Sequence, residues 1–239
     1  MRRAEVPWLA LGVSAGAGLV GSAVLVAAGP ATPPCAGVGL MVLLGGVALV
    51  AARRRARRLG WANAVTLGRL VGVGWITALT LTLTVGSPAP AASLTALIII
   101  AAVCLALDGV DGAVARARGE ASEFGARFDM ETDAAMIMIL CVAVAAGGGV
   151  GAWVLAIGLF RYVYWLASFR VAALRVPLPP SLLRKAVAVA QSIALLSCLL
   201  LAVTGVGPSW LPAAVAGLAL AGLAWSFVSV IVAQLRAAR

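Results

Sequence analysis

Histidine is absent from this chain of 239 residues, and its four cysteines are scattered among apolar stretches. No two cysteines have the Cys-x-x-Cys spacing of a zinc site, so neither a His/Cys metal centre nor a disulfide framework is expected. We expect the cysteines to be small buried hydrophobic residues. Because there is no histidine, a carboxylate is the expected general base wherever one is needed.

Charge is also scarce, at 11% of residues, whereas hydrophobic residues make up 63% and the mean hydropathy is +1.10. A soluble domain has roughly a quarter charged residues and about half apolar ones. The apolar excess falls in blocks of about twenty residues, the length that crosses a bilayer as a helix. The sequence therefore predicts an all-α, polytopic transmembrane bundle embedded in the lipid bilayer.

Breaks between the apolar blocks predict about eight transmembrane helices. The expected helices cover about 7–28, 35–52, 63–85, 93–107, a fifth from within 108–133 to about 146, then 152–169, 186–203 and an eighth ending near 236. An arginine run at 53–58 separates the first two helices from the other six. We therefore predict an N-terminal part, 1–60, with two helices and a basic link, and a six-helix part, 61–239.

The basic residues, which give a net charge of +10, predict the orientation. With the N-terminus inside, every Lys and Arg except Arg69 and Arg161 falls in an inside segment: Met1–Val6, Arg53–Asn63, Asp108–Phe128, Arg170–Lys185 or Arg236–Arg239. The positive-inside rule then predicts that both termini are cytoplasmic. It also accounts for the charge without a nucleic-acid partner. Arginine greatly exceeds lysine and alanine is abundant, which favours a bacterial cell membrane.

Seven of the eight acidic residues lie between Asp108 and Asp133. Two groups there share helix faces: Asp108, Asp111, Gly112, Ala115 and Arg116 in the first, and Gly125, Asp129 and Asp133 in the second. Joined by a short link, the two helical arms can direct four carboxylates at one another. Such a group would take up protons or bind cations, and oxygen ligands suit Mg²⁺ or Mn²⁺.

Two divalent ions in this site could clamp a pyrophosphate during an in-line displacement. Gly112, Ala115 and Gly125 leave room for a phosphate or a planar group, and Arg116 offers a bidentate phosphate donor. Asp133 could accept the proton of an attacking hydroxyl. The structural alternative is a set of helix-terminal acids paired with arginines, namely Arg116, Arg118 and Arg127.

The pattern Asp108-x2-Asp111-Gly112-x2-Ala115-Arg116-x8-Gly125-x3-Asp129-x3-Asp133 resembles the full signature of the CDP-alcohol phosphotransferase family. A second pattern, Asn63-x2-Thr66-x2-Arg69, resembles an element on the first core helix of that family. The resemblance covers roughly Trp61 to Arg239.

The resemblance implies a homodimer of six-helix cores, each with a polar cavity open to the cytoplasm. It implies that a CDP-linked alcohol, often CDP-diacylglycerol, gives its substituted phosphate to the hydroxyl of a second alcohol, so that CMP leaves. The metal ligands it implies are Asp108, Asp111, Asp129 and Asp133, with Asp133 as a ligand, the general base or both. The donor contacts it implies are Asn63, Thr66, Arg69, Asp108, Gly112, Ala115, Arg116 and Gly125.

The acceptor is predicted from the remaining basic residues. Arg161 falls near the middle of an apolar helix, where a charge usually faces a cavity. Arg170 and Lys185 flank a basic connection that could bind a phosphorylated acceptor, such as glycerol 3-phosphate or inositol phosphate. Positive-inside anchoring explains the connection equally well. Ala134 stands where many family members carry Arg or Lys. The acceptor of a relative is therefore not assigned to this chain.

The alternative functions are those of a transporter or channel and of a pseudoenzyme. A transporter or channel would use intramembrane charges at a midplane site, with the acidic stretch as a cytoplasmic cation site. The signature spacing and the gathering of acids at one membrane face argue against it. A pseudoenzyme retained for assembly would not need all four aspartates of the signature.

Overall fold

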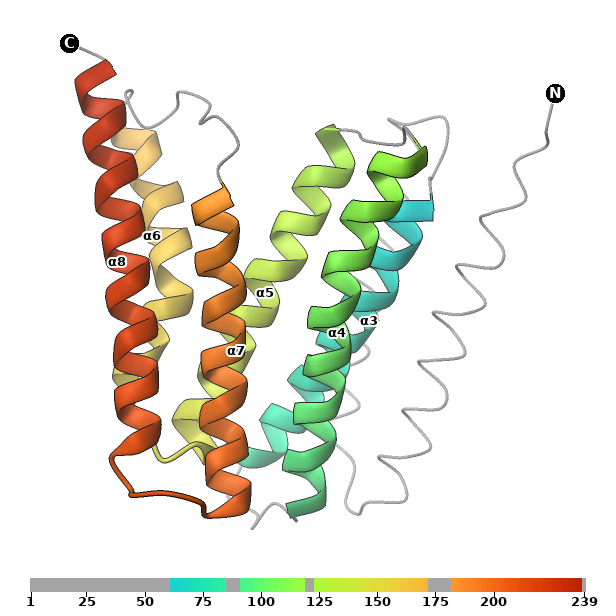
Figure 1. Cartoon of the computed structure of the whole chain (residues 1–239), viewed down its shortest axis with the longest axis vertical. Helices are drawn as coiled ribbons and strands as arrows, with labels where there is room; N and C mark the ends of the chain where they lie inside the picture. The colour runs from blue at the N-terminus through green and yellow to red at the C-terminus, as the bar shows by residue number, and fades with distance from the viewer. Residues whose placement is uncertain (1–60, 85–90, 119–122, 172–181, 238–239) are drawn as a thin grey trace, which may run out of the picture. The chain divides into compact units, whose positions relative to one another are not determined.

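The computed structural model describes residues 61–84, 91–118, 123–171 and 182–237, and every regular element among them is helical. The elements are α3 (Trp61–Thr84), α4 (Ala91–Arg118), α5 (Glu123–Gly147), the short 3-10 helix η1 (Ala152–Val154), α6 (Leu155–Arg170), α7 (Leu182–Thr204) and α8 (Leu211–Ala237) (Figure 1). The all-helical prediction is confirmed for this part of the chain.

Six of these segments are long and apolar enough to cross a membrane: Val65–Thr84, Ala91–Gly109, Phe128–Gly147, Ala152–Arg170, Leu183–Thr204 and Leu211–Gln234. Their order and bounds agree with the last six predicted helices to within a few residues at most ends. The two helices expected within 1–60 lie outside the described residues. The count of eight helices and the cytoplasmic position of both termini therefore stay predictions.

One helix end differs clearly from expectation. The fourth apolar block predicts a helix that stops near Leu107, but α4 continues without a break to Arg118. The residues after Asp111 are rich in alanine and arginine, which are strong helix formers. Loss of hydrophobicity thus marks where the chain leaves the apolar span, and it does not mark where the helix ends. The continuous helix carries the first arm of the signature.

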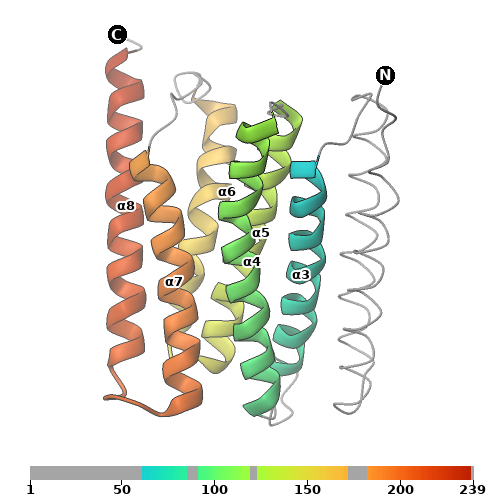
Figure 2. The same cartoon turned by 45° about the vertical axis from the view of Figure 1, so that its right-hand side comes forward.

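The described residues form two compact units that divide within α5, after Met136. In the first unit, α3 and α4 lie side by side in both views (Figures 1 and 2). They lie close together at Gly72, where an added Cβ would lie 2.3 Å from the Sγ atom of Cys104. The same Sγ lies 3.8 Å from the backbone oxygen of Arg69. Because Asp108 follows Cys104 by one helical turn, this contact brings Arg69 and Asp108 to the same level.

The second unit contains the rest of α5 together with η1, α6, α7 and α8. Helices α7 and α8 form a hairpin whose connection contains two glycines with positive φ, Gly205 and Gly207. Tyr164 on α6 donates a hydrogen bond of 2.9 Å to the Oε1 atom of Gln234 on α8. The cysteines of the described residues, Cys104, Cys141 and Cys198, are free and buried, as predicted. Cys35 lies outside the described residues.

Candidate active site

Arg69 is the central side chain of the site. It lies on α3, within an otherwise apolar span, and only 1% of its side chain is exposed. A buried guanidinium is costly unless it is paired, and it stays protonated in proteins. The position of Arg69 therefore requires anionic partners.

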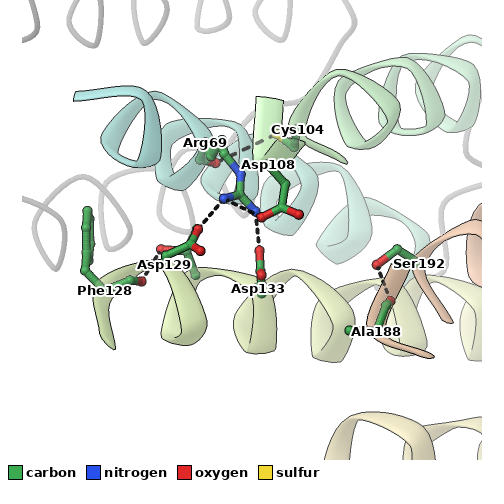
Figure 3. A network of polar contacts seen from close by, with 9 residues as sticks. Arg69, Cys104, Asp108, Phe128, Asp129, Asp133, Ala188 and Ser192 are labelled. Atoms are coloured by element: carbon green, nitrogen blue, oxygen red, sulfur yellow. Dashed lines mark hydrogen bonds and ion pairs between the residues drawn. The ribbon is translucent and has the colours of Figure 1, made fainter. Parts of the chain in front are cut away.

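Three carboxylates supply that pairing, and all of them belong to the first unit (Figure 3). The Nη1 atom of Arg69 lies 3.1 Å from Oδ1 of Asp108 on α4 and 2.5 Å from Oδ1 of Asp129 on α5. The Nη2 atom donates a hydrogen bond to Oδ1 of Asp133, one turn further along α5. One arginine thus joins three helices through three aspartates.

The same aspartates could hold a metal ion. Asp108, Asp129 and Asp133 each offer a carboxylate oxygen, and these oxygens all lie within 4.8 Å of one another. Their side chains retain 14%, 36% and 33% exposure, so they can be approached although Arg69 is enclosed. Three carboxylates and one guanidinium leave two negative charges in excess. An oxygen-only, anionic donor set fits a hard divalent cation such as Mg²⁺ or Mn²⁺.

The structure brings some of the other predicted site residues to the same helices. Thr66 is buried on α3, one turn before Arg69, and Gly125 is half-buried on α5, one turn before Asp129. Asn63 also lies on α3, and α4 carries Asp111, Gly112, Ala115 and Arg116. The side chains of these last five residues lie outside the described part of the structure, as do those of Arg118 and Arg127.

The predicted acceptor residues belong to the second unit. Arg161 is half-buried on α6, Arg170 is exposed at the end of α6, and Lys185 is exposed on α7. Arg161 is thus partly enclosed, as expected for a charge within an apolar span. The acceptor role of all three residues stays a prediction.

Sequence reasoning did not predict the contact of Arg69 with the aspartates. It placed Arg69 in the donor site through the resemblance alone. The available signal was its position as one of only two basic residues outside the predicted inside segments. A lone charge in an apolar helix calls for a partner of opposite charge. Which carboxylates would supply it depends on contacts between helices, and the sequence does not show these.

A comparison with protein families supplies the context for this site. The model of the CDP-alcohol phosphatidyltransferase family matches residues 59–228, which include Arg69 and the three aspartates. That family transfers a phosphatidyl group from a CDP-alcohol. Membership in it agrees with the six helices of the described residues that are long and apolar enough to cross a membrane. Comparisons with curated proteins and with solved structures found no match. Because the match covers more than half of the sequence and contains the carboxylate cluster, the chain belongs to the CDP-alcohol phosphatidyltransferase family.

Proposed function

We propose that this protein transfers the phosphatidyl group of CDP-diacylglycerol to the hydroxyl of a small phosphorylated alcohol, such as glycerol 3-phosphate or inositol phosphate, and releases CMP. The reaction belongs to phospholipid biosynthesis and takes place at the cytoplasmic face of a bacterial cell membrane. The observation that carries the proposal is the convergence of three aspartates from two helices within the region matched by the family.

Two divalent ions, Mg²⁺ or Mn²⁺, are the proposed cofactors, held by Asp108 and Asp111 on α4 and by Asp129 and Asp133 on α5. When bound, they would neutralise the pyrophosphate of the donor and stabilise the leaving oxygen. The oxygen donors of Asp108, Asp129 and Asp133 suit these ions. Asp111 follows Asp108 on the same helix by three residues, close to one turn.

The chemical step needs one base and one displacement. Asp133 accepts the proton of the acceptor hydroxyl, whose oxygen attacks the phosphorus that carries diacylglycerol. The bond between that phosphorus and the oxygen of CMP breaks, and CMP leaves with the electron pair. This step needs no reactant besides the donor and the acceptor. A positioned carboxylate of this kind contributes roughly 10²–10⁴-fold to the rate.

The donor site is proposed to combine residues of α3, α4 and α5. The residues assigned to it are Asn63, Thr66, Arg69, Asp108, Gly112, Ala115, Arg116 and Gly125. The acceptor site is proposed to use Arg161, Arg170 and Lys185, whose charge suits a phosphate. A homodimer of six-helix cores is the proposed assembly, and residues 1–60 are proposed to add two further helices.

The test is an acceptor panel. Purified protein in liposomes is given CDP-diacylglycerol and Mg²⁺ with glycerol 3-phosphate, inositol phosphate, glycerol, inositol or serine, and CMP is measured. We expect CMP release with a phosphorylated acceptor and none after EDTA treatment. Release with unphosphorylated alcohols alone would contradict the acceptor assignment, and release unaffected by EDTA would contradict the metal site. The family match gives no support to the alternative of a transporter or channel.

A further inference from the structure

We propose that Arg69 is an internal counter-cation: in the metal-free protein its guanidinium takes the place of the metal ions, and it competes with them for Asp108, Asp129 and Asp133. Arg69 would then hold the site together before metal binds and would set how tightly metal binds. The competition step rests on the metal dependence proposed above.

The contacts of Arg69 are those of a bridging cation. Its Nη1 atom lies between Asp108 and Asp129, at 3.1 and 2.5 Å, and its Nη2 atom reaches Asp133. A guanidinium can do this because its donors form a rigid planar fork, whereas a lysine ammonium presents a single nitrogen. Arg69 thus contacts every carboxylate that the described residues contribute to the candidate metal site.

Electrostatics makes such a cation necessary. Three carboxylate oxygens within 4.8 Å of one another repel strongly in a site partly shielded from water. Without a metal ion, only protonation or another cation can relieve this repulsion. Among the described residues, Arg69, with 1% of its side chain exposed, is a cation that contacts all three. Removing it should push the three carboxylates apart and loosen α3 from α4 and α5.

The same argument gives the sign of the effect on metal binding. A divalent ion that enters the cluster meets a resident positive charge and must share or displace its oxygen contacts. Arg69 therefore opposes metal binding although it stabilises the metal-free protein. A residue that only shaped the metal site would have the opposite effect, because its loss would weaken metal binding.

The first arm of the test measures thermal unfolding of the full chain in detergent. In EDTA, Arg69→Gln should lower the melting temperature by about 5 °C or more relative to the wild type. Saturating Mn²⁺ should then raise the melting temperature of Arg69→Gln more than that of the wild type. Equal melting temperatures in EDTA, or a smaller rise with Mn²⁺ in the variant, would overturn the proposal.

The second arm measures the Kd for Mn²⁺ from the signal of free Mn²⁺ in electron paramagnetic resonance. Arg69→Gln should bind Mn²⁺ about tenfold more tightly or better, and Arg69→Lys should fall in between. Arg184→Gln on α7 removes the same charge outside the cluster and should leave the Kd unchanged. An unchanged or weaker Kd in Arg69→Gln would overturn this proposal alone, whereas a wild type that binds no Mn²⁺ would contradict the proposed metal dependence.

A further variant covers the case in which Arg69→Gln fails to fold in EDTA. The double variant Arg69→Gln/Asp108→Asn removes one charge of each sign, so it should fold better than the single variant. Addition of Mn²⁺ during purification should also recover folded Arg69→Gln. If neither the second substitution nor Mn²⁺ recovers folded protein, Arg69 is needed for reasons other than its charge in the cluster, and the proposal is wrong.

Discussion

Each aspartate of the cluster can be tested by one isosteric substitution. Asp108→Asn and Asp129→Asn keep the size of the side chain but remove a charged ligand, so each should lower kcat/KM for CMP release by about a hundredfold or more. Glu131→Gln is the matched control, because Glu131 lies on α5 between Asp129 and Asp133 and is exposed. A rate for Asp108→Asn or Asp129→Asn that equals that of Glu131→Gln would refute the ligand role of that aspartate.

Substitution of Arg161 tests whether this residue binds the acceptor. Arg161→Ala should raise the KM for the acceptor by about tenfold and leave the KM for CDP-diacylglycerol nearly unchanged, because the lost contact is to the acceptor phosphate. Arg161→Lys keeps the charge and should raise the acceptor KM less. A larger effect on the donor KM than on the acceptor KM would place Arg161 on the donor side.

The residues of the cluster differ in how far sequence predicts them. The carboxylates are predictable because helical spacing alone places Asp129 and Asp133 on one face. The ion pairs of Arg69 with them are not predictable in this way. Asp129 lies 60 positions after Arg69 in the chain, and Asp133 lies 64 positions after it. Apolar patterning predicts that a helix crosses the membrane, but the contact between two such helices depends on their relative rotation.

Between helices, the close packing of α3 against α4 keeps Arg69 level with Asp108. Gly72→Ala should disturb this packing, because the new Cβ would lie 2.3 Å from Sγ of Cys104. We expect a loss of about 1–3 kcal/mol in stability, measured as a lower melting temperature. Gly68→Ala, on the same helix, meets nothing within 4 Å and should be nearly neutral.

The double variant Gly72→Ala/Cys104→Ala separates this contact from other effects. Loss of Sγ removes the clash, so the double variant should be more stable than Gly72→Ala alone. If the double variant loses as much stability as Gly72→Ala and Cys104→Ala lose together, Gly72 matters for another reason.

The sequence contains Gly72 and Cys104 but does not show that they are in contact. It also predicts the end of α4 near Leu107, about three turns before the helix stops at Arg118.

For the whole molecule, the distribution of basic residues predicts that the active site faces the cytoplasm. In a Cys35→Ser background, Val206→Cys in the exposed α7–α8 connection should react with a membrane-impermeant maleimide in intact cells. Val171→Cys, exposed at the end of α6, should react only after permeabilisation. Cys104, Cys141 and Cys198 are buried and should stay unlabelled. The reverse pattern would contradict a cytoplasmic active site.

Phosphatidyl transfer at the aspartate cluster is tested by the balance of its products. Liposomes with the wild-type protein, Mg²⁺, glycerol 3-phosphate and CDP-diacylglycerol labelled in the acyl chains should yield CMP and a new labelled phospholipid in equal amounts. Asp133→Asn, which lacks the proposed base, should yield neither at more than about a hundredth of that rate. CMP without labelled phospholipid would contradict phosphatidyl transfer, and equal rates in the wild type and Asp133→Asn would contradict the role of Asp133 as the base.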